Sequence, residues 1–346
     1  MDKDLCVFGP VSSLLLWRAA RCGSIELSRL DEGQPDLERC HARVRDVRQL
    51  DLVRMLGDVP LDVIVGNRTK SHSGTLHTIV LAGKMPTDSF VHVRQELYVC
   101  APELCFALLG RGGQMLPLAR LGLELCGTYS LTPDQSGRYC TSFALTDKRR
   151  LSAFLGLMGR RHGLTVARKA LGLVADGSGS PRETGLYLAL TAPVRMGGYG
   201  LWRPELNAKV SSASDTYALN QLYRDDKGKK VLAVDLCGLG ILPKPQSCDL
   251  GSIPNPQYWE ALARDGLDAV GIGPADIMSS GKLEVKALRI ARLLGKPTRA
   301  SRGLLRQRRR DLFALLFDES FWHVEHETLC QLASYRTSAP RGRRVA

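Results

Sequence analysis

Apolar positions in the first part of the chain switch between helical and strand-like spacing. The segment 12–21 opens with two serines that suit a helix N-cap and continues with apolar residues at helical spacing. Three later segments alternate in a period of two, are rich in β-branched residues and are bounded by glycine, asparagine or proline: LDVIVGN, TLHTIVLAG and SFVHVRQELYVCA. The pattern predicts a small sheet, with further helical stretches around 36–56.

Helical spacing returns between residues 102 and 177. Pro102 opens the apolar helix PELCFALLGRG, and the next helix, LPLARLGLELCG, is expected to end at Gly127 as a C-terminal cap. Thr146 is the expected N-cap of TDKRRLSAFLGLMGRR, and GLTVARKALGLVADG continues as another helix. We expect these last two helices to connect two halves of the chain.

A domain boundary is predicted near 176–180. In DGSGSPRE, Ser180 suits an N-cap, Pro181 the first helical position and Glu183 the third. The glycine-rich segment APVRMGGYGLWRPELNAKV is expected to be a loop. YALNQLYRDD and KKVLAVDLCG then predict a hairpin over 217–237.

The rest of the chain predicts alternating helices and strands. NPQYWEALARDG is an expected helix, 268–273 an expected central strand that pairs with VLAVD, and KLEVKALRIARLLG an expected helix that stops at Gly295. The fold class is therefore α/β. The predicted parts are a mixed α/β N-terminal domain over 1–130, a helical connector over 131–177, a three-layer α/β domain over 178–296, and a basic helical tail with a disordered C-terminus over 297–346.

Composition narrows the class of protein. The chain has 346 residues, 44% hydrophobic and 24% charged, as globular proteins do. No apolar run approaches the roughly 20 residues of a membrane helix, and the N-terminus carries acids where a signal peptide needs basic residues, so we expect a cytoplasmic protein with no membrane partner. Ten cysteines are scattered without the spacing of a disulfide framework or a zinc site, which predicts reduced thiols.

A formal net charge of +13 favours a polyanionic partner, and nucleic acid is the commonest one in the cytoplasm. One basic cluster is Lys148, Arg149 and Arg150. In SRGLLRQRRRD at 301–311, a helix would place Arg302, Arg306 and Arg310 on one face, where guanidinium groups can follow a phosphate backbone. The alternative is that these residues form solvated helix faces.

Several motifs together resemble a known family. SPRETGLYLAL, GGYGLWRPELN, a strand pair ending VLAVD and WEALARDGLDAVGI follow the order of a bacterial domain that is similar to very-short-patch-repair endonucleases of the PD-(D/E)XK type. SSLLLWR, ELYVCAPEL and LGLELCGTYSL resemble the companion domain of actinobacterial proteins related to AbiEi-type antitoxins. The resemblance covers most of residues 10–295. It implies a restriction-endonuclease-like C-terminal domain and a toxin–antitoxin, defence or regulatory role.

The resemblance also implies where a catalytic site would lie. In such nucleases, carboxylates on a helix and a hairpin hold Mg²⁺, which activates water for phosphodiester hydrolysis. Glu183 matches the helix acid of the family, and Asp235 stands where the second hairpin strand usually has a glutamate. If the hairpin register shifts, Asp225 or Asp226 could supply the acid of the first strand.

Four departures from the family argue against cleavage. Cys237 replaces an expected aspartate, and Gln221 or Arg224 falls near the place of the first-strand acid. The histidine expected after the acid is absent from GLGILPKPQSCDLGS, and Tyr258 replaces a helix arginine. Magnesium is therefore expected only if activity survives.

The candidate residues also have structural interpretations. Glu183 at the third helical position suits a capping box, and Asp235 could cap a turn or pair with a lysine. His323, His326 and Cys330 would share a helix face, but without a fourth ligand they suit packing better than zinc, and no metal site is predicted.

Three functions stay open from the sequence. The favoured one is a non-catalytic nuclease-fold protein that binds nucleic acid or a partner such as a cognate toxin. The second is an active Mg²⁺-dependent endonuclease that uses Glu183, Asp235 and one of Asp225 or Asp226. The third is a protein-interaction module without nucleic acid.

Overall fold

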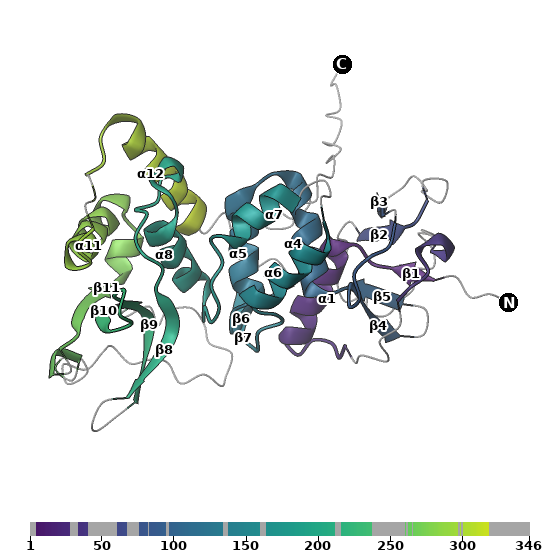
Figure 1. Cartoon of the computed structure of the whole chain (residues 1–346), viewed down its shortest axis with the longest axis horizontal. Coiled ribbons are helices and arrows are strands. Elements are labelled where there is room, and N and C mark those ends of the chain that lie inside the picture. Colours follow the sequence, from purple (N-terminus) through teal and green to yellow (C-terminus); the bar gives the residue numbers. More distant parts are fainter. Residues whose placement is uncertain are drawn as a thin grey trace, which may run out of the picture.

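The computed structural model describes most of the chain. The described residues are 5–27, 34–40, 61–67, 76–81, 83–94, 97–133, 138–159, 164–211, 216–236, 260, 262–264, 266–296, 298 and 300–317. Helices and mixed sheets alternate along them, which confirms the predicted α/β class. Figure 1 shows the N-terminal strands at one end of the molecule, a group of helices in the middle and a second sheet with its own helices at the other end.

The N-terminal strands form two small sheets. The order β1-β5-β4 joins Cys6–Val7, Leu97–Cys100 and Phe90–Arg94, and β2 (Leu61–Val65) pairs in parallel with β3 (Leu76–Val80). The strands predicted from β-branched residues are therefore confirmed. Of the helical stretches expected around 36–56, the described part contains a short 3-10 helix at Leu37–Arg39, and residues 41–56 lie outside the described residues.

A buried carboxylate in β2 holds the start of α1 (Pro10–Arg21). Asp62 accepts hydrogen bonds from the backbone N–H groups of Val11 at 3.0 Å and Ser12 at 2.6 Å, and Ser12 Oγ accepts from the N–H of Asp62 at 2.8 Å. These donors have no partner within the helix, so Asp62 caps it from another element. Gly9 makes room for this arrangement, because a Cβ at that position would collide with the Asp62 carboxylate.

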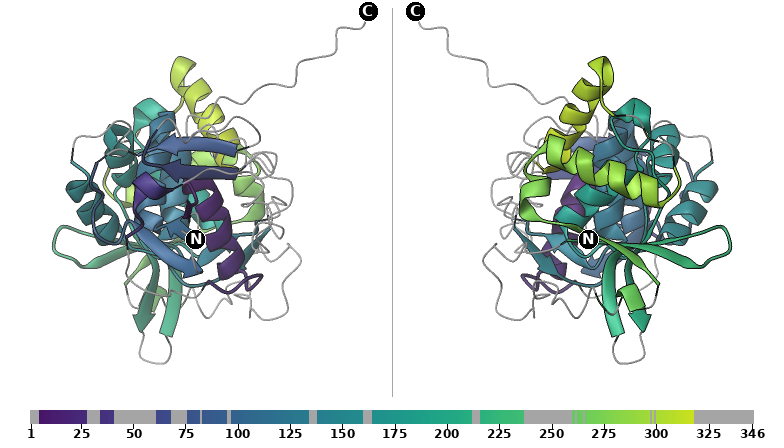
Figure 2. Two further views of the ribbon diagram at one scale, coloured as in Figure 1. Left: turned by 90° about the vertical axis from the view of Figure 1, so that its right-hand side faces the viewer. Right: turned by 90° about the vertical axis from the view of Figure 1, so that its left-hand side faces the viewer.

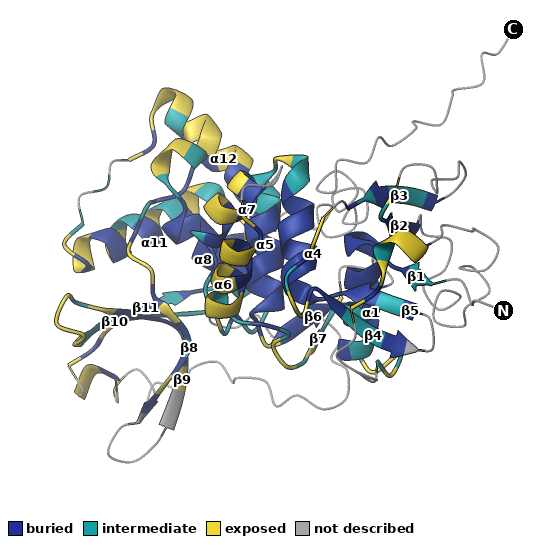
Figure 3. Ribbon diagram, turned by 45° about the vertical axis from the view of Figure 1, so that its right-hand side comes forward, coloured by how far each residue is buried: buried dark blue, intermediate teal, exposed yellow. Residues whose placement is uncertain are grey.

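Four helices form the middle of the molecule: α4 (Pro102–Leu109), α5 (Met115–Leu125), α6 (Lys148–Leu157) and α7 (Leu164–Leu171). Figure 3 shows that α4 and α5 are almost completely buried. Gly122 permits close packing, because a Cβ there would lie 2.5 Å from Val174 and 2.9 Å from Phe106. The predicted connector over 131–177 thus packs directly on the helices before it. It also contains part of a hairpin that the sequence pattern did not predict, β6 (Tyr129–Leu131) with β7 (Tyr139–Thr141).

The C-terminal sheet has the order β11-β10-β9-β8. Its strands are β8 (Glu205–Ser211), β9 (Thr216–Arg224), β10 (Lys230–Leu236) and β11 (Asp268–Ile272), and only the β10–β11 pair is parallel among them. The hairpin and the pairing of β11 with β10 are confirmed. Two expectations are wrong: the segment expected to be a loop contains β8, and β11 lies at the end of the described strand order rather than at its centre.

Helices cover both faces of this sheet. On one face lie α8 (Pro181–Thr191) and α11 (Ser280–Leu293), with the short α10 (Pro274–Ile277) nearby (Figure 2). Helix α12 (Gly303–Phe317) packs on α8 and η4 (Val194–Met196). On the other face, Leu262 packs with Ala208, Leu222 and Ala233. The helix predicted around 255–266 is described at 260 and 262–264, and most of its other residues lie outside the described part.

The two halves share a core. Thr128 donates its N–H to the Ser178 carbonyl at 2.8 Å, and Gly177 donates to the Cys126 carbonyl at 3.0 Å. The Tyr129 and Thr184 hydroxyl groups lie 3.0 Å apart. The predicted boundary near 176–180 is thus crossed by backbone hydrogen bonds, and one cluster of buried apolar side chains runs from Val7 to Leu316.

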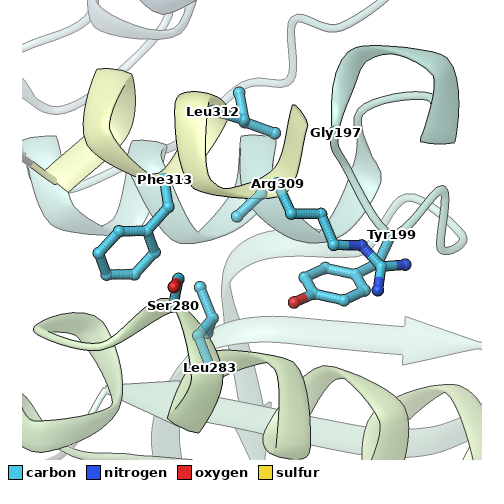
Figure 4. A pocket seen from close by; sticks show the side chains of 8 residues that line it. Gly197, Tyr199, Ser280, Leu283, Arg309, Leu312 and Phe313 are labelled. Atoms are coloured by element: carbon cyan, nitrogen blue, oxygen red, sulfur yellow. The ribbon is translucent and has the colours of Figure 1, made fainter. Parts of the chain in front are cut away.

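Helix α12, which lies in the predicted basic tail, packs on α8 and η4 through the buried Leu312 and Leu316, and one arginine adds polar contacts. Arg309 donates to Glu284 Oε1 at 2.9 Å and to Ser301 Oγ at 2.7 Å, and its guanidinium group lies 4.2 Å from the centre of the Tyr199 ring. Figure 4 shows this side chain extended over the ring. It lies beside a small cavity, in which the centre of a water molecule could occupy about 10 Å³. Gly197, with φ 93°, allows the close approach to α12, because a Cβ there would collide with the Arg308 carbonyl oxygen.

Among the described residues, none of the helices has the length and the apolar character of a membrane-spanning segment.

The buried position of Arg309 predicts a large effect of its removal. Arg309→Ala should lower the free energy of unfolding by about 3 kcal/mol, because it leaves the Glu284 carboxylate without its buried partner. Arg308→Ala is the matched control, and it should change stability by less than about 0.5 kcal/mol because Arg308 is exposed. Urea unfolding of both variants measures the difference. Equal effects would contradict the role of Arg309.

Candidate functional site

Glu183 lies at the start of α8, where its carboxylate accepts three hydrogen bonds. Gly179 N–H donates to Oε2 at 2.8 Å, Asn207 Nδ2 donates to the same oxygen at 2.6 Å, and Ser180 Oγ donates to Oε1 at 3.2 Å. Ser180 Oγ also accepts from the Glu183 N–H at 3.2 Å, so the two residues form a reciprocal N-terminal cap. The structure therefore gives Glu183 the capping arrangement that its position after Ser180 and Pro181 predicts.

Asn207 joins this cap to the sheet. It lies in β8 with φ 46°, in the left-handed region that asparagine tolerates better than most residues. Its Nδ2 also donates to the Gly177 carbonyl at 2.7 Å, so one side chain connects the turn before α8 with the strand. This role could not be predicted from the sequence, because the segment around Asn207 has the composition of a loop.

Asn220 and Asp235 face each other on β9 and β10. The register Val234↔Gln221 makes Asn220 the partner of Asp235, and Leu206↔Gln221 places Asn207 beside Asn220. Asp235 is also the partner of Gly271 in β11. The sheet thus carries a row of Asn207, Asn220 and Asp235, which we call the polar row.

At the polar row, side-chain oxygens accept hydrogen bonds from backbone N–H groups of the neighbouring strand. The N–H of Asn220 donates to Asp235 Oδ1 at 3.3 Å, and the N–H of Leu236 donates to Asn220 Oδ1 at 2.7 Å. Each side chain therefore accepts a hydrogen bond from a backbone N–H of the opposite strand. Buried or half-buried backbone groups need such a partner. Both Asn220 and Asp235 therefore have a structural task, which is to accept these backbone hydrogen bonds.

The charge of Asp235 acts on the Glu183 carboxylate. Burial raises the pKa of Glu183, the hydrogen bonds from Gly179, Asn207 and Ser180 oppose that rise, and the negative charge of Asp235 adds to it. The net direction of the pKa is upward from 4.5. Glu183 and Asp235 are therefore neighbours, as the resemblance to nucleases implies, but their surroundings disfavour a doubly charged pair.

The polar row fits a magnesium ion poorly. Mg²⁺ requires negatively charged or carbonyl oxygens that converge on an octahedron, with water in the remaining positions. Both Glu183 oxygens accept hydrogen bonds, and Asn220 Oδ1 accepts one from Leu236. Within the described ranges, no cluster of three or more histidine, cysteine, aspartate or glutamate residues could hold a metal. Cys237, His323, His326 and Cys330 lie outside those ranges.

Asp225 and Asp226 do not join Glu183 and Asp235. Asp225 belongs to the hairpin turn, where Oδ1 accepts from the N–H groups of Lys227 at 2.9 Å and Lys229 at 2.8 Å. Asp226 is exposed beside it. The turn lies at the opposite end of β10 from Asp235, at roughly 16 Å for five residues of extended chain. The structure brings together two of the four predicted acids.

A bulge explains why the sequence did not single out Asn220. The pairing of β9 with β10 shifts by one residue between Lys230 and Leu232. Counted from the turn pair Lys230↔Arg224 without this shift, Asp235 would face Leu219; with the shift it faces Asn220. Neither Gln221 nor Arg224, the residues that the motif spacing indicated, lies opposite Asp235.

The basic cluster at 148–150 lies in the first turn of α6. Asp147, not the expected Thr146, is the N-cap: its carboxylate accepts from the Arg150 N–H at 2.7 Å, while Thr146 Oγ1 donates to Glu103 at 2.6 Å. Arg150 also forms an ion pair of 3.3 Å with Glu103. Acidic neighbours thus balance part of this cluster.

One further cation lies close to the cluster. Burial lowers the pKa of Lys148, the charge of Arg203 lowers it further, and Asp176 opposes the change. Arg203 is exposed in the segment before β8, next to the half-exposed Trp202. Arg203 was not predicted as part of this cluster, because nothing in the spacing of residues relates it to α6.

The stripe of arginines on α12 is exposed. Arg302 directly precedes the helix, and Arg306 and Arg310 follow at intervals of four residues, each with an exposed side chain. No ion pair found between described residues includes any of the three. Arg309, by contrast, is buried. It lies on the packed side of α12, whereas the side chains of Arg306 and Arg310 are exposed to solvent.

The hydrogen bonds at Glu183 predict two effects on stability. Glu183→Ala should lower the free energy of unfolding by about 1–3 kcal/mol, because it removes the cap and leaves the Asn207 and Gly179 donors without their acceptor. Glu183→Gln should cost less, because an amide oxygen in the place of Oε2 can still accept both bonds. Urea unfolding at pH 7 ranks the variants, and equal losses would contradict the arrangement.

The raised pKa of Glu183 predicts how stability depends on pH. A carboxyl group with a higher pKa in the folded state binds a proton more readily there, so protonation favours folding. The wild type should therefore gain stability relative to Glu183→Gln as the pH falls from 7 towards 4.5, the ordinary value for glutamate. A relative loss over this interval would mean that the pKa is lowered instead.

Nothing among known protein families, curated proteins and solved structures matches this chain.

Proposed function

We propose that the chain is a non-catalytic protein of nuclease fold that binds nucleic acid through its phosphates, in a toxin–antitoxin, defence or regulatory setting. The observation that carries this proposal is the polar row. An asparagine amide, Asn220, lies opposite Asp235 where a nuclease would need a second acid, and Glu183 is hydrogen-bonded as a helix cap. The setting rests on the resemblance of the sequence motifs alone.

The basic residues support the binding part of the proposal. Arg306 and Arg310 are exposed one turn apart on α12, Arg302 is exposed just before the helix, and a guanidinium group can bind a phosphate with two parallel hydrogen bonds. Arg309 joins this helix to Glu284 of α11, so the arginines are presented on a fixed element. Contacts of this kind give affinity without sequence preference.

The lack of converging acids among the described residues predicts that the protein does not cut DNA. With Mg²⁺ or Mn²⁺, the full chain should leave labelled single- and double-stranded DNA intact, and Asp235→Asn should behave in the same way. Gel electrophoresis of the labelled DNA gives the readout. Metal-dependent cutting that Asp235→Asn abolishes would instead support the active endonuclease, the second function considered from the sequence.

The exposed arginines predict how binding responds to salt. Changing Arg302, Arg306 and Arg310 together to Gln should weaken binding to unrelated DNA sequences about equally. It should also reduce the slope of log affinity against log salt by about one for each phosphate that the variant no longer binds. Fluorescence anisotropy over a salt series measures both quantities.

A matched control separates the effect of the stripe on binding from the effect of losing positive charge in general. Changing Arg39, Lys84 and Arg138 to Gln also removes three exposed charges, but these residues lie in the N-terminal half of the chain. It should leave the salt slope nearly unchanged. If the α12 variant behaves like this control, the stripe does not bind nucleic acid, and a partner protein such as a cognate toxin becomes the better candidate.

A further inference from the structure

Two cysteines from distant parts of the chain meet at the end of α1. Cys22 directly follows α1, and Cys140 lies in β7. Cys22 Sγ lies 3.8 Å from the Leu131 carbonyl oxygen, and Cys140 Sγ lies 3.7 Å from the carbonyl oxygens of Ser130 and Arg21. Both sulfur atoms therefore contact the same short stretch of β6, and both side chains are partly exposed.

The two thiols interact directly and unequally. A hydrogen bond between them lowers the pKa of Cys140, burial opposes this, and the Arg21 guanidinium lowers it again, to a final pKa of about 7. The same hydrogen bond, burial and the charge on Cys140 raise the pKa of Cys22. Glu124 also faces the pair and acts to raise the pKa of Cys22. Cys140 is thus the thiol of the pair that ionises more readily near neutral pH.

A second thiol pair shows what this pair has in addition. Cys105 donates to the Cys100 carbonyl at 3.6 Å, but both residues are fully buried. Burial raises the pKa of Cys105 far above its usual range, and a buried thiol cannot meet a reagent from solution. Thiol reactivity depends on a thiolate and on access, and the Cys22–Cys140 pair provides both.

We propose that Cys22 and Cys140 form a thiol–disulfide exchange site for small disulfides of the glutathione type. The Cys140 thiolate attacks one sulfur of oxidised glutathione, which breaks its S–S bond, forms a mixed disulfide and releases one glutathione thiolate. Cys22 then loses its proton and attacks Cys140 Sγ, which releases the second glutathione. Starting from the Cys140 thiolate, the protein gives up two electrons and the Cys22 proton, and one oxidised glutathione becomes two reduced molecules.

The resulting disulfide would join the end of α1 to the β6–β7 hairpin. This region already holds buried ionic contacts: Arg18 binds Glu124 at 2.8 and 2.5 Å, and Arg21 donates to the carbonyl oxygens of Glu124 and Gly127. The bond would close a loop of roughly 120 residues, so oxidation should stabilise the N-terminal half. The site is independent of the polar row and of α12.

The test uses the full chain in buffers of defined oxidised and reduced glutathione at pH 7.5. Samples are quenched with an alkylating reagent and mapped by peptide mass spectrometry. We expect a cross-linked Cys22–Cys140 peptide, while Cys100 and Cys105 stay reduced. Cys22→Ser should stop at the mixed disulfide on Cys140, and Cys140→Ser should form neither product. Cys6→Ser, which changes a partly exposed cysteine elsewhere, should behave as the wild type.

Two results would overturn the proposal. One is a wild-type protein whose Cys22 and Cys140 stay alkylatable in excess oxidised glutathione. The other is a disulfide that instead engages Cys237, Cys248 or Cys330, which lie outside the described residues. Circular dichroism checks that the serine variants fold. If one does not, the wild-type peptide map still decides, because the cross-linked peptide either forms or does not.

Discussion

The hydrogen bonds to the Glu183 carboxylate are the constraint on which the C-terminal domain depends. They connect the turn before α8, the first turn of that helix and β8 through Gly179, Ser180 and Asn207. Asn207 in turn fixes the position of the polar row, because its neighbour across the strands is Asn220 and the next partner is Asp235. Because the Glu183 carboxylate has this structural task, it is poorly suited to bind a metal ion as well.

Fold and chemistry are separate properties of this molecule. A helix followed by three antiparallel strands and a parallel strand is an arrangement that can bring acids together, and it brings Glu183 next to Asp235 here. The residues that complete the row are amides, whose oxygens carry no formal charge, and the Asn220 oxygen already accepts a backbone hydrogen bond. Activity depends on the side chains at a site rather than on the fold that positions them.

Much of the fold follows from local sequence patterns. The Ser180–Pro181–Glu183 start of α8, the alternation in β2 to β5 and the hairpin turn at Asp225 were predictable, because each depends on residues that are close in sequence. The β8 strand was not, because its glycine-rich approach looks like a loop. The position of Asn220 opposite Asp235 depends on a one-residue bulge near Lys230, and the proximity of Arg203 to Lys148 depends on tertiary packing. Neither the bulge nor this packing produces a periodic pattern in the sequence.

Metal binding tests the central claim most directly. Isothermal titration of Mn²⁺ into the full chain, with Asp235→Asn measured beside it, reports binding whether or not any cleavage follows. If Glu183 is a helix cap and the residue opposite Asp235 is the neutral amide of Asn220, the two proteins should give the same weak, non-saturating heats. Saturable binding by the wild type that Asp235→Asn removes would show that the polar row does form a metal site, and would contradict this account.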